Sequence, residues 1–172
     1  YFAAAHLGLI LVPLNFRLSR NELAMILADS QSRVLIAQHK FLDRVGGMAQ
    51  QVRELEKTIW TQRPPGDEME GGALDYETFL EGQPKVPPLQ EAIEDDHVAH
   101  LYYTSGTTGR PKGVMLTHKN VKSHALGTVA ELHLTDRDHW FHVAPLFHLA
   151  DAWATFAVTW VCLLYTSPSP RD

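Results

Sequence analysis

Residues 104–113 read TSGTTGRPKG and combine four hydroxyl side chains, three glycines and one lysine between two apolar runs. Glycines allow backbone N–H groups to approach an anion closely, hydroxyl groups add donors, and Lys112 adds a compact positive charge. The stretch therefore predicts a phosphate-binding loop. Its candidate binding residues are Thr104, Ser105, Gly106, Thr107, Thr108, Gly109, Lys112 and Gly113.

The loop differs from the Walker P-loop in both spacing and flanks. Counting from Gly106, the second glycine of a Walker pattern falls on Pro111, and the residue after Lys112 is Gly113 rather than Ser or Thr. Residues 114–117, VMLT, predict a second strand where a Walker loop enters a helix. These differences disfavour a P-loop NTPase. A Gly/Thr-rich hairpin turn is the structural alternative, for which the stretch is long.

The elements around the loop alternate between strand and helix patterns. Before it, the sequence predicts a strand at 9–12, a helix after the capping box of Ser19 and Glu22, a strand at 33–37, and a helix over 41–55 interrupted at Gly46 and Gly47. From Val98 it predicts a strand, the loop, a second strand, a helix at about 120–132, a strand at 140–143 and a helix from 151. This order predicts an α/β fold with a mostly parallel sheet and flanking helices.

Two segments do not fit that alternation. Residues 62–88, rich in Pro, Gly and acids, are interpreted as a surface connection with one short helix at 76–80. Residues 163–172 change composition abruptly and are interpreted as a non-native tail, because two prolines stand where a helix over 152–164 would continue. We therefore expect one partial domain at 1–162.

Composition and charge exclude several classes of protein. The 172 residues are 45% hydrophobic, which suits a folded domain. The net charge of −5 comes from an acidic stretch between Asp67 and Asp96 that holds ten of the 20 acids. Because no basic stripe with interleaved aromatic residues occurs, we expect no nucleic-acid partner.

Metal, disulfide and membrane sites are not expected either. Cys162 is the only cysteine, and the histidines at 133, 139, 142 and 148 lack a zinc-ligand spacing. The longest apolar run, 152–164, is too short to span a bilayer and is interpreted as a buried helix. With no secretory signal recognised, we expect a cytoplasmic protein. Trp140, Trp153 and Trp160 are interpreted as core residues rather than pocket walls.

The stretch TSGTTGRPKG resembles the phosphate-binding motif of the adenylate-forming, or AMP-binding, superfamily. This group includes acyl-CoA synthetases, luciferases and the adenylation domains of nonribosomal peptide synthetases. Residues 1–15, YFAAAHLGLILVPLN, and 143–148, VAPLFH, are similar to segments that flank the motif in that family. The resemblance implies that the chain is an incomplete portion of the large N-terminal domain of these enzymes.

The same resemblance implies an acid-activating ligase. A carboxylic acid attacks the α-phosphate of ATP with Mg²⁺, which gives an acyl-adenylate and pyrophosphate, and coenzyme A then takes the acyl group. Lys112 and His148 become candidate catalytic residues, with His148 placed near the carboxylate and acyl pocket. The alternative for His148 is a histidine satisfied by backbone contacts. The loop amides and hydroxyls would follow the charged pyrophosphate as it leaves.

The choice of acid rests on residues 145–151, PLFHLAD, which look more like fatty or aryl acyl-CoA synthetases. A fatty acid is our preferred substrate. Asp151 keeps open an amino-acid adenylation domain, in which a carboxylate holds the substrate amine. A nucleotide-binding module without chemistry is a further alternative.

The family also uses a Tyr-Gly-x-Thr-Glu segment for Mg²⁺, an Asp for the ribose and a late Lys, and none of these occurs in the 172 residues. We therefore expect the chain alone to be inactive. The resemblance leaves peripheral membrane contact of a full-length enzyme open.

Overall fold

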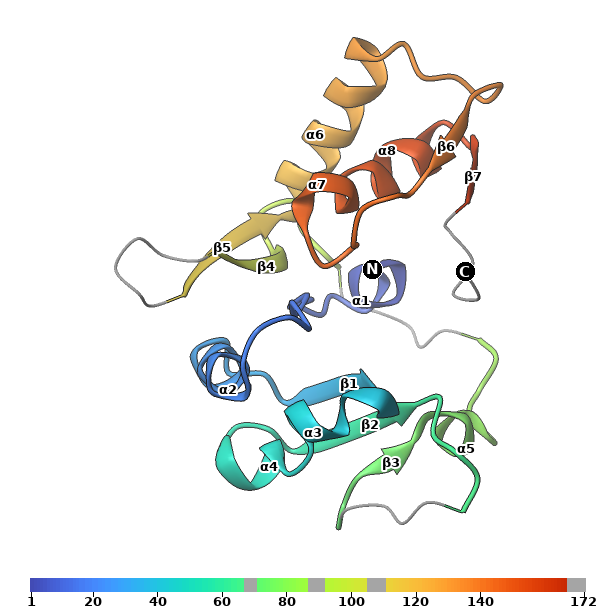
Figure 1. The fold of residues 1–172 in the computed structure, drawn as a ribbon. Helices are drawn as coiled ribbons and strands as arrows, with labels where there is room; N and C mark the ends of the chain where they lie inside the picture. The colour runs from blue at the N-terminus through green and yellow to red at the C-terminus, as the bar shows by residue number, and fades with distance from the viewer. Residues whose placement is uncertain (67–70, 87–91, 105–110, 167–172) are drawn as a thin grey trace. The chain divides into compact units, whose positions relative to one another are not determined.

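The computed structural model describes residues 1–66, 71–86, 92–104 and 111–166, and these form a mixed α/β structure (Figure 1). The chain divides into two compact units. The first unit comprises Tyr1–Asn15, Gln90–Tyr102 and Val114–Asp172, and the second comprises Phe16–Leu89 and Tyr103–Gly113. Each unit is described separately below.

The second unit contains a small parallel sheet, with β2 in the middle between β1 and β3. Its elements are α2 (Arg20–Asp29), β1 (Val34–Gln38), η1 (His39–Phe41), α3 (Leu42–Val45), α4 (Met48–Gln51), β2 (Lys57–Thr61), β3 (Leu74–Asp75) and α5 (Tyr76–Leu80). In the register of β1 and β2, Val34 lies opposite Lys57 and Gln38 opposite Thr61. The alternation of strands and helices explains why the pairing is parallel.

Helix α2 begins where the capping box predicts. The Glu22 amide donates to the Ser19 hydroxyl, and the Glu22 carboxylate accepts from the Ser19 amide at 2.8 Å. Hydrogen bonding to Ser19 lowers the pKa of Glu22. One face of the helix is buried and comprises Leu23, Ile26 and Leu27. The predicted start of α2 is confirmed.

The helix predicted over 41–55 is interrupted at the glycine pair. Gly47 adopts a left-handed conformation, with φ of 67°, between α3 and α4, which is the region where glycine is favoured. Strand β2 was missed because its five residues, KTIWT, mix polar and apolar types, although Thr58, Ile59 and Trp60 are buried. Within 62–88, α5 lies at the predicted position, but β3 adds an unexpected strand to the sheet.

The first unit is built around helices α6 and α8 (Figure 1). Its elements are α1 (Phe2–His6), β4 (Val98–Thr104), β5 (Lys112–Thr117), α6 (His118–Glu131), β6 (His139–Phe141), α7 (Leu149–Ala152), α8 (Ala154–Trp160) and β7 (Leu164–Thr166). Strands β4 and β5 form a two-stranded sheet and each has residues in both units. Strands β6 and β7 pair in parallel.

Two predicted elements of this unit differ from the structure. The helix over 152–164 ends at Trp160, because Cys162 adopts a left-handed conformation, with φ of 57°, and turns the chain back. The strand over 9–12 is reduced to one parallel bridge between Leu11 and His100. Leu9 and Ile10 are exposed, so this run does not form the predicted strand within a sheet.

Part of the segment interpreted as a tail packs into the first unit. Leu163 is buried with Ala154 and Val158, and Leu164–Thr166 pair with β6. Residues 167–172 lie outside the described residues. The non-native origin of the tail stays a prediction. None of the helices in the described part of the chain has the length and hydropathy that a bilayer crossing requires.

We predict that Ser19→Ala lowers the free energy of unfolding by about 1 kcal/mol, because the Glu22 amide loses its capping acceptor. Urea denaturation of the chain measures this change. Ser19→Asp should retain most of the stability, since aspartate is also a good capping residue. Ser123→Ala on the exposed face of α6 is the matched control and should leave stability unchanged or slightly raised. Equal losses in Ser19→Ala and Ser123→Ala would contradict the capping role.

Candidate functional site

The predicted phosphate loop connects the end of β4 to the start of β5. Thr104 is the last residue of β4 and Lys112 is the first of β5, and the two strands are neighbours in one sheet. A connection this short joins antiparallel strands, because parallel neighbours need a crossover of roughly a dozen residues or more. The end of β4 and the start of β5 therefore lie side by side, which brings Thr104 and Lys112 to the base of the loop.

The base of the loop offers suitable groups for a phosphate. Thr104, Lys112 and Gly113 are exposed, so a hydroxyl, an ammonium and a glycine backbone are accessible at one end of the strand pair. The other predicted binding residues lie outside the described residues: Ser105, Gly106, Thr107, Thr108 and Gly109. Residues 98–117 contain no Asp or Glu, so this hairpin supplies no carboxylate ligand for Mg²⁺.

Strand β4 is anchored by a buried aromatic group in the first unit. The His100 ring, whose residue is 3% exposed, contacts the rings of Tyr1, Tyr102 and Phe156 at centroid distances of 5.4, 5.9 and 5.4 Å. Burial lowers the pKa of His100 to about 4 because the charged imidazolium is poorly solvated there. His100 is therefore neutral at pH 7 and acts as a packing residue.

Tyr103 holds the C-terminal end of β4 within the second unit. Its hydroxyl donates to a carboxylate oxygen of Asp29, at the end of α2, at 2.5 Å. Burial and the Asp29 carboxylate raise the pKa of Tyr103, so the phenol remains a donor at neutral pH. Within the second unit, Tyr103 thus holds the residue that precedes Thr104.

A hydrogen-bonded pair of tyrosines connects β4 to residues 143–148. The hydroxyl groups of Tyr1 and Tyr102 lie 2.8 Å apart, and the Tyr1 hydroxyl also donates to the carbonyl oxygen of Leu146. Because Tyr1 has one hydroxyl hydrogen, Tyr102 is the donor to Tyr1. Burial raises the pKa of both tyrosines. No sequence pattern indicates this contact, because it joins residues that are distant along the chain.

His148 is an exposed residue at the start of α7. Its Nδ1 accepts a hydrogen bond from the Ala150 amide at 3.1 Å, and its own amide donates to the Pro145 carbonyl at 3.0 Å. This geometry agrees with the interpretation of a histidine satisfied by backbone contacts. It lies in the first unit, whereas Thr104, Lys112 and Gly113 lie in the second. Among the candidate residues that the structure describes, those three are brought together by one hairpin.

Asp151 is a buried residue whose role sequence reasoning missed. It is 4% exposed, and its carboxylate accepts from His142 Nδ1 at 3.0 Å, the Ala144 amide at 3.1 Å and Trp140 Nε1 at 3.4 Å. Both carboxylate oxygens are therefore used inside the unit. This disfavours the interpretation in which Asp151 holds a substrate amine. Trp140 and His142 carry ring N–H groups and precede the acid, which was the available sequence signal for this buried site.

The three tryptophans do not share one environment. Trp140 and Trp153 pack against the core cluster of Ala154, Val158 and Leu163. Trp160 is 54% exposed, so its assignment to the core is wrong. It lines a groove of about 500 Å³ in the first unit, together with Phe2, Val121, Lys122 and Phe156.

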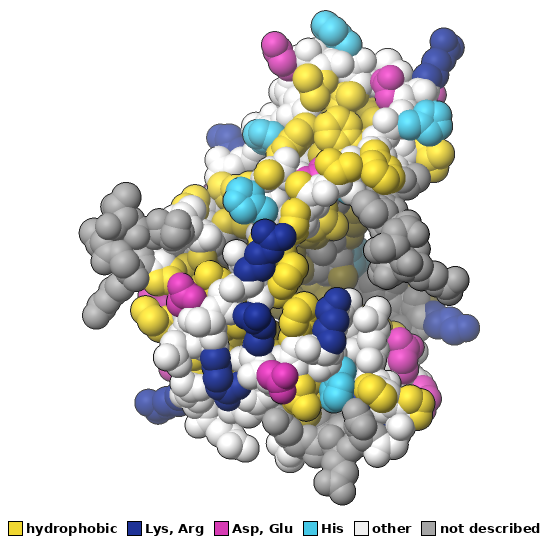
Figure 2. All heavy atoms as spheres, viewed as in Figure 1, with side chains coloured by type: hydrophobic (Ala, Val, Ile, Leu, Met, Phe, Trp, Pro, Cys, Tyr) yellow, Lys and Arg dark blue, Asp and Glu magenta, His cyan; other side chains and the backbone are white. Residues whose placement is uncertain are grey.

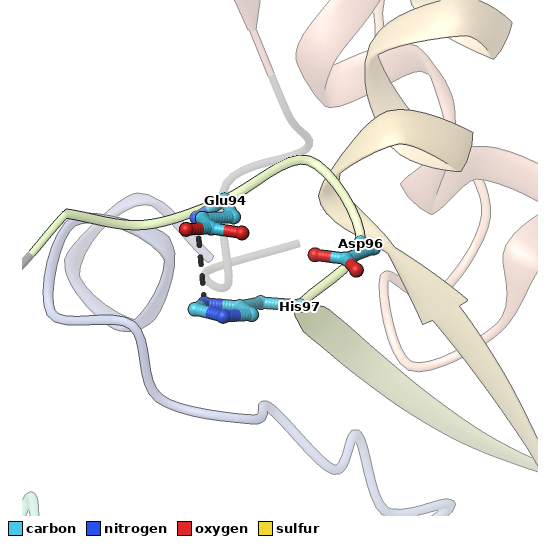
Figure 3. A group of neighbouring side chains, drawn as sticks. All are labelled: Glu94, Asp96 and His97. Carbon is cyan, nitrogen blue, oxygen red and sulfur yellow. Dashed lines mark hydrogen bonds between the residues drawn. The ribbon is translucent and has the colours of Figure 1, made fainter.

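A group of polar side chains precedes β4. Glu94, Asp96 and His97 are exposed, and their potential ligand atoms lie within 4.8 Å of one another (Figure 3). The Glu94 amide donates to His97 Nδ1 at 3.4 Å, which is the bond drawn in Figure 3. The bond occupies one imidazole nitrogen. The neighbouring Asp95 pairs instead with Lys122 at 2.8 Å.

The AMP-binding enzyme family matches residues 1–167. The chain belongs to the AMP-binding enzyme family. A match of this extent includes the loop, both strands that hold it and the segment that contains His148. The sequence-based identification from TSGTTGRPKG is confirmed.

Relatives of this AMP-binding chain are CoA ligases. It is 32% identical over 95% of its length to a protein named 4-hydroxybutyrate--CoA ligase 2 from Metallosphaera sedula, of which it covers 31%. It is 31% identical over 86% of its length to a 2-succinylbenzoate--CoA ligase from Listeria monocytogenes, of which it covers 26%. The chain thus spans about a third or less of the length of these relatives.

A solved structure confirms the fold. The inhibitor-bound N-terminal domain of FACL13 from Mycobacterium tuberculosis matches with a TM-score of 0.80 and 28% identity, over 97% of this chain and 39% of that one. The predicted α/β class, and its assignment to the N-terminal domain of adenylate-forming enzymes, are therefore correct.

We predict that acid destabilises the AMP-binding chain through His100. Its pKa is about 4 when folded and about 6.5 in an unfolded chain, so the unfolded state binds the proton first as the pH falls. Stability present above about pH 6.5 should be lost progressively toward pH 4, by about 2 to 3 kcal/mol. Urea denaturation across this range measures the loss.

The variant His100→Gln should be less stable at pH 7, because ring contacts are lost, but should show a smaller decline between pH 6.5 and 4. His6→Gln, which removes an exposed histidine from α1, is the matched control. An equal reduction of the pH dependence in both variants would contradict the assignment to His100.

Proposed function

We propose that this chain forms part of an ATP-dependent acid–thiol ligase. The enzyme would join a carboxylic acid to AMP as an acyl-adenylate with release of pyrophosphate, and would then transfer the acyl group to coenzyme A. The observation that carries the proposal is the loop base formed by Thr104 and Lys112 in a chain of the AMP-binding family. CoA ligases among the relatives support the acceptor.

Lys112 and the loop residues would bind the phosphates of ATP. A positive side chain at the base of the loop lowers the energy of charge that develops on departing pyrophosphate, since it is already placed before the reaction. The Thr104 hydroxyl and the Gly113 backbone add short-range donors. Mg²⁺ would accompany ATP and be held by its phosphates and by groups outside the hairpin, because residues 98–117 contain no carboxylate.

The acid would lie near residues 143–148. Side chains of Val143, Leu146 and His148 in this segment are exposed, which offers apolar surface beside an imidazole. This composition supports an apolar acid, and a fatty acid remains our preferred substrate. The relatives' names include a hydroxy acid and an aryl acid, so the family accommodates several carboxylates.

We propose further that the chain alone is inactive, since the Mg²⁺, ribose and C-terminal lysine segments expected for the family do not occur in its sequence. Pyrophosphate release from ATP, measured for the isolated chain with and without a panel of acids, tests this inactivity. A cytoplasmic location and peripheral membrane contact stay predictions. Acid-dependent release of pyrophosphate by the isolated chain would refute the proposal that the chain alone is inactive.

In a full-length enzyme that contains this chain, we predict that Lys112→Ala slows acyl-adenylate formation by about 10 to 100-fold, because the leaving pyrophosphate loses a positive charge. Pyrophosphate release measures this step. Acyl-CoA formation from preformed acyl-adenylate should change little, since pyrophosphate has already left.

Lys57→Ala is the matched control, because it removes an exposed lysine from β2 in the same unit. It should leave both steps unchanged. Equal losses in both steps for Lys112→Ala would overturn the phosphate role. Equal effects of the two lysine variants would also overturn it, because they would show that the loss of any positive charge in this unit slows the reaction.

A further inference from the structure

We propose that Asp151 is a positioning residue for the acid-binding segment, a role that rests on the proposed function. Asp151 does not reach the substrate, because it is 4% exposed and its oxygens are occupied by donors of the same unit. It acts through the backbone of residues 143–148. A determinant of acid binding thus lies behind residues 143–148 rather than on their surface.

The three donors to Asp151 define where the segment begins. Trp140 belongs to β6, His142 follows it, and Ala144 donates its backbone amide. Asp151 itself lies in α7, after the segment. One carboxylate therefore clamps the two ends of residues 143–148 together. All three partners are N–H groups, which suits a carboxylate because it only accepts hydrogen bonds.

The clamp is directional, unlike apolar packing. Hydrogen bonds weaken steeply when the donor, hydrogen and acceptor are not nearly in line, so the Ala144 amide and the His142 ring are held in a preferred orientation. Burial strengthens this constraint, because a donor that loses its acceptor there is left unsatisfied. The carboxylate of Asp151 thus fixes the path of the backbone at residues 142–144, which apolar packing alone would not do.

The far side of the segment is also held, but by other groups. The amides of Asp151 and Ala152 donate to the His148 carbonyl at 3.3 and 3.2 Å, and the Tyr1 hydroxyl donates to the Leu146 carbonyl. With both ends fixed, Val143, Leu146 and His148 are presented on the surface. Figure 2 shows hydrophobic side chains gathered over the part that carries α7, α8 and β6. A shift at the Asp151 clamp would therefore move the residues that would contact the acid.

The variant Asp151→Asn tests the clamp with little change in volume. Asparagine offers one carbonyl oxygen and one NH₂ group to three donors, so at least one of the donors faces another donor. In the full-length enzyme we expect the KM for the acid to rise about tenfold, while the KM for ATP changes less than twofold. The acid used is the one from a panel of octanoate, benzoate and 4-hydroxybutyrate that gives the fastest pyrophosphate release.

Ala125→Gly is the matched control for lost stability. Ala125 is buried in α6 of the same unit, outside the core cluster against which Trp140 packs, and makes none of the hydrogen bonds of the clamp. It should lower the melting temperature without raising the KM for the acid. An equal rise of that KM in both variants would overturn the positioning role, and so would an unchanged KM in Asp151→Asn when the wild-type enzyme is active.

Hydrogen exchange separates this inference from the proposed function. In Asp151→Asn, the amides of Ala144 and His148 should exchange at least about fivefold faster than in the wild type, whereas those of α6 should not change. A wild-type enzyme that releases pyrophosphate with no acid of the panel would refute the proposed function. Unchanged exchange at Ala144 would overturn the clamp itself, whatever the activity.

Discussion

The anchoring of β4 is the constraint on which the candidate site depends. A phosphate loop can direct its donors only if the two strands that carry it are fixed, and β4 is fixed by burying a neutral imidazole among aromatic rings. Burial lowers the pKa of His100 to about 4, so this packing favours the uncharged imidazole at neutral pH. That packing holds the first part of β4, whose last residue is Thr104.

The same anchoring connects β4 to residues 143–148 within the first unit. The Tyr102 hydroxyl is bonded to Tyr1, which is bonded in turn to the backbone at Leu146. Tyr102 is two residues before Thr104, and Leu146 lies between the clamp residues of the 143–148 segment. The hydrogen bonds from Tyr102 to Tyr1 and from Tyr1 to Leu146 therefore hold residues 143–148 against β4 within the first unit.

Local sequence patterns predicted the local parts of this structure. The capping box of Ser19 and Glu22 located the start of α2, because the pattern itself makes the hydrogen bonds. The ten-residue motif identified the family, since its glycines, hydroxyls and lysine are needed in one order. Strand β2 was missed because a strand with a polar residue at each end carries no clear period, and its burial depends on neighbours elsewhere in the chain.

Contacts between distant residues could not be predicted from the same patterns. The exposure of Trp160 depends on where α8 ends, which depends on a left-handed Cys162 that no residue preference predicts. The clamp at Asp151 is a similar case, because an acid seven residues after an alanine amide has no characteristic spacing. An exposed acid at position 151 would be free to bind an amine, whereas a buried acid with three N–H partners is committed to the fold. Burial therefore decides between two functions that one residue type allows, and it is the fold that decides burial.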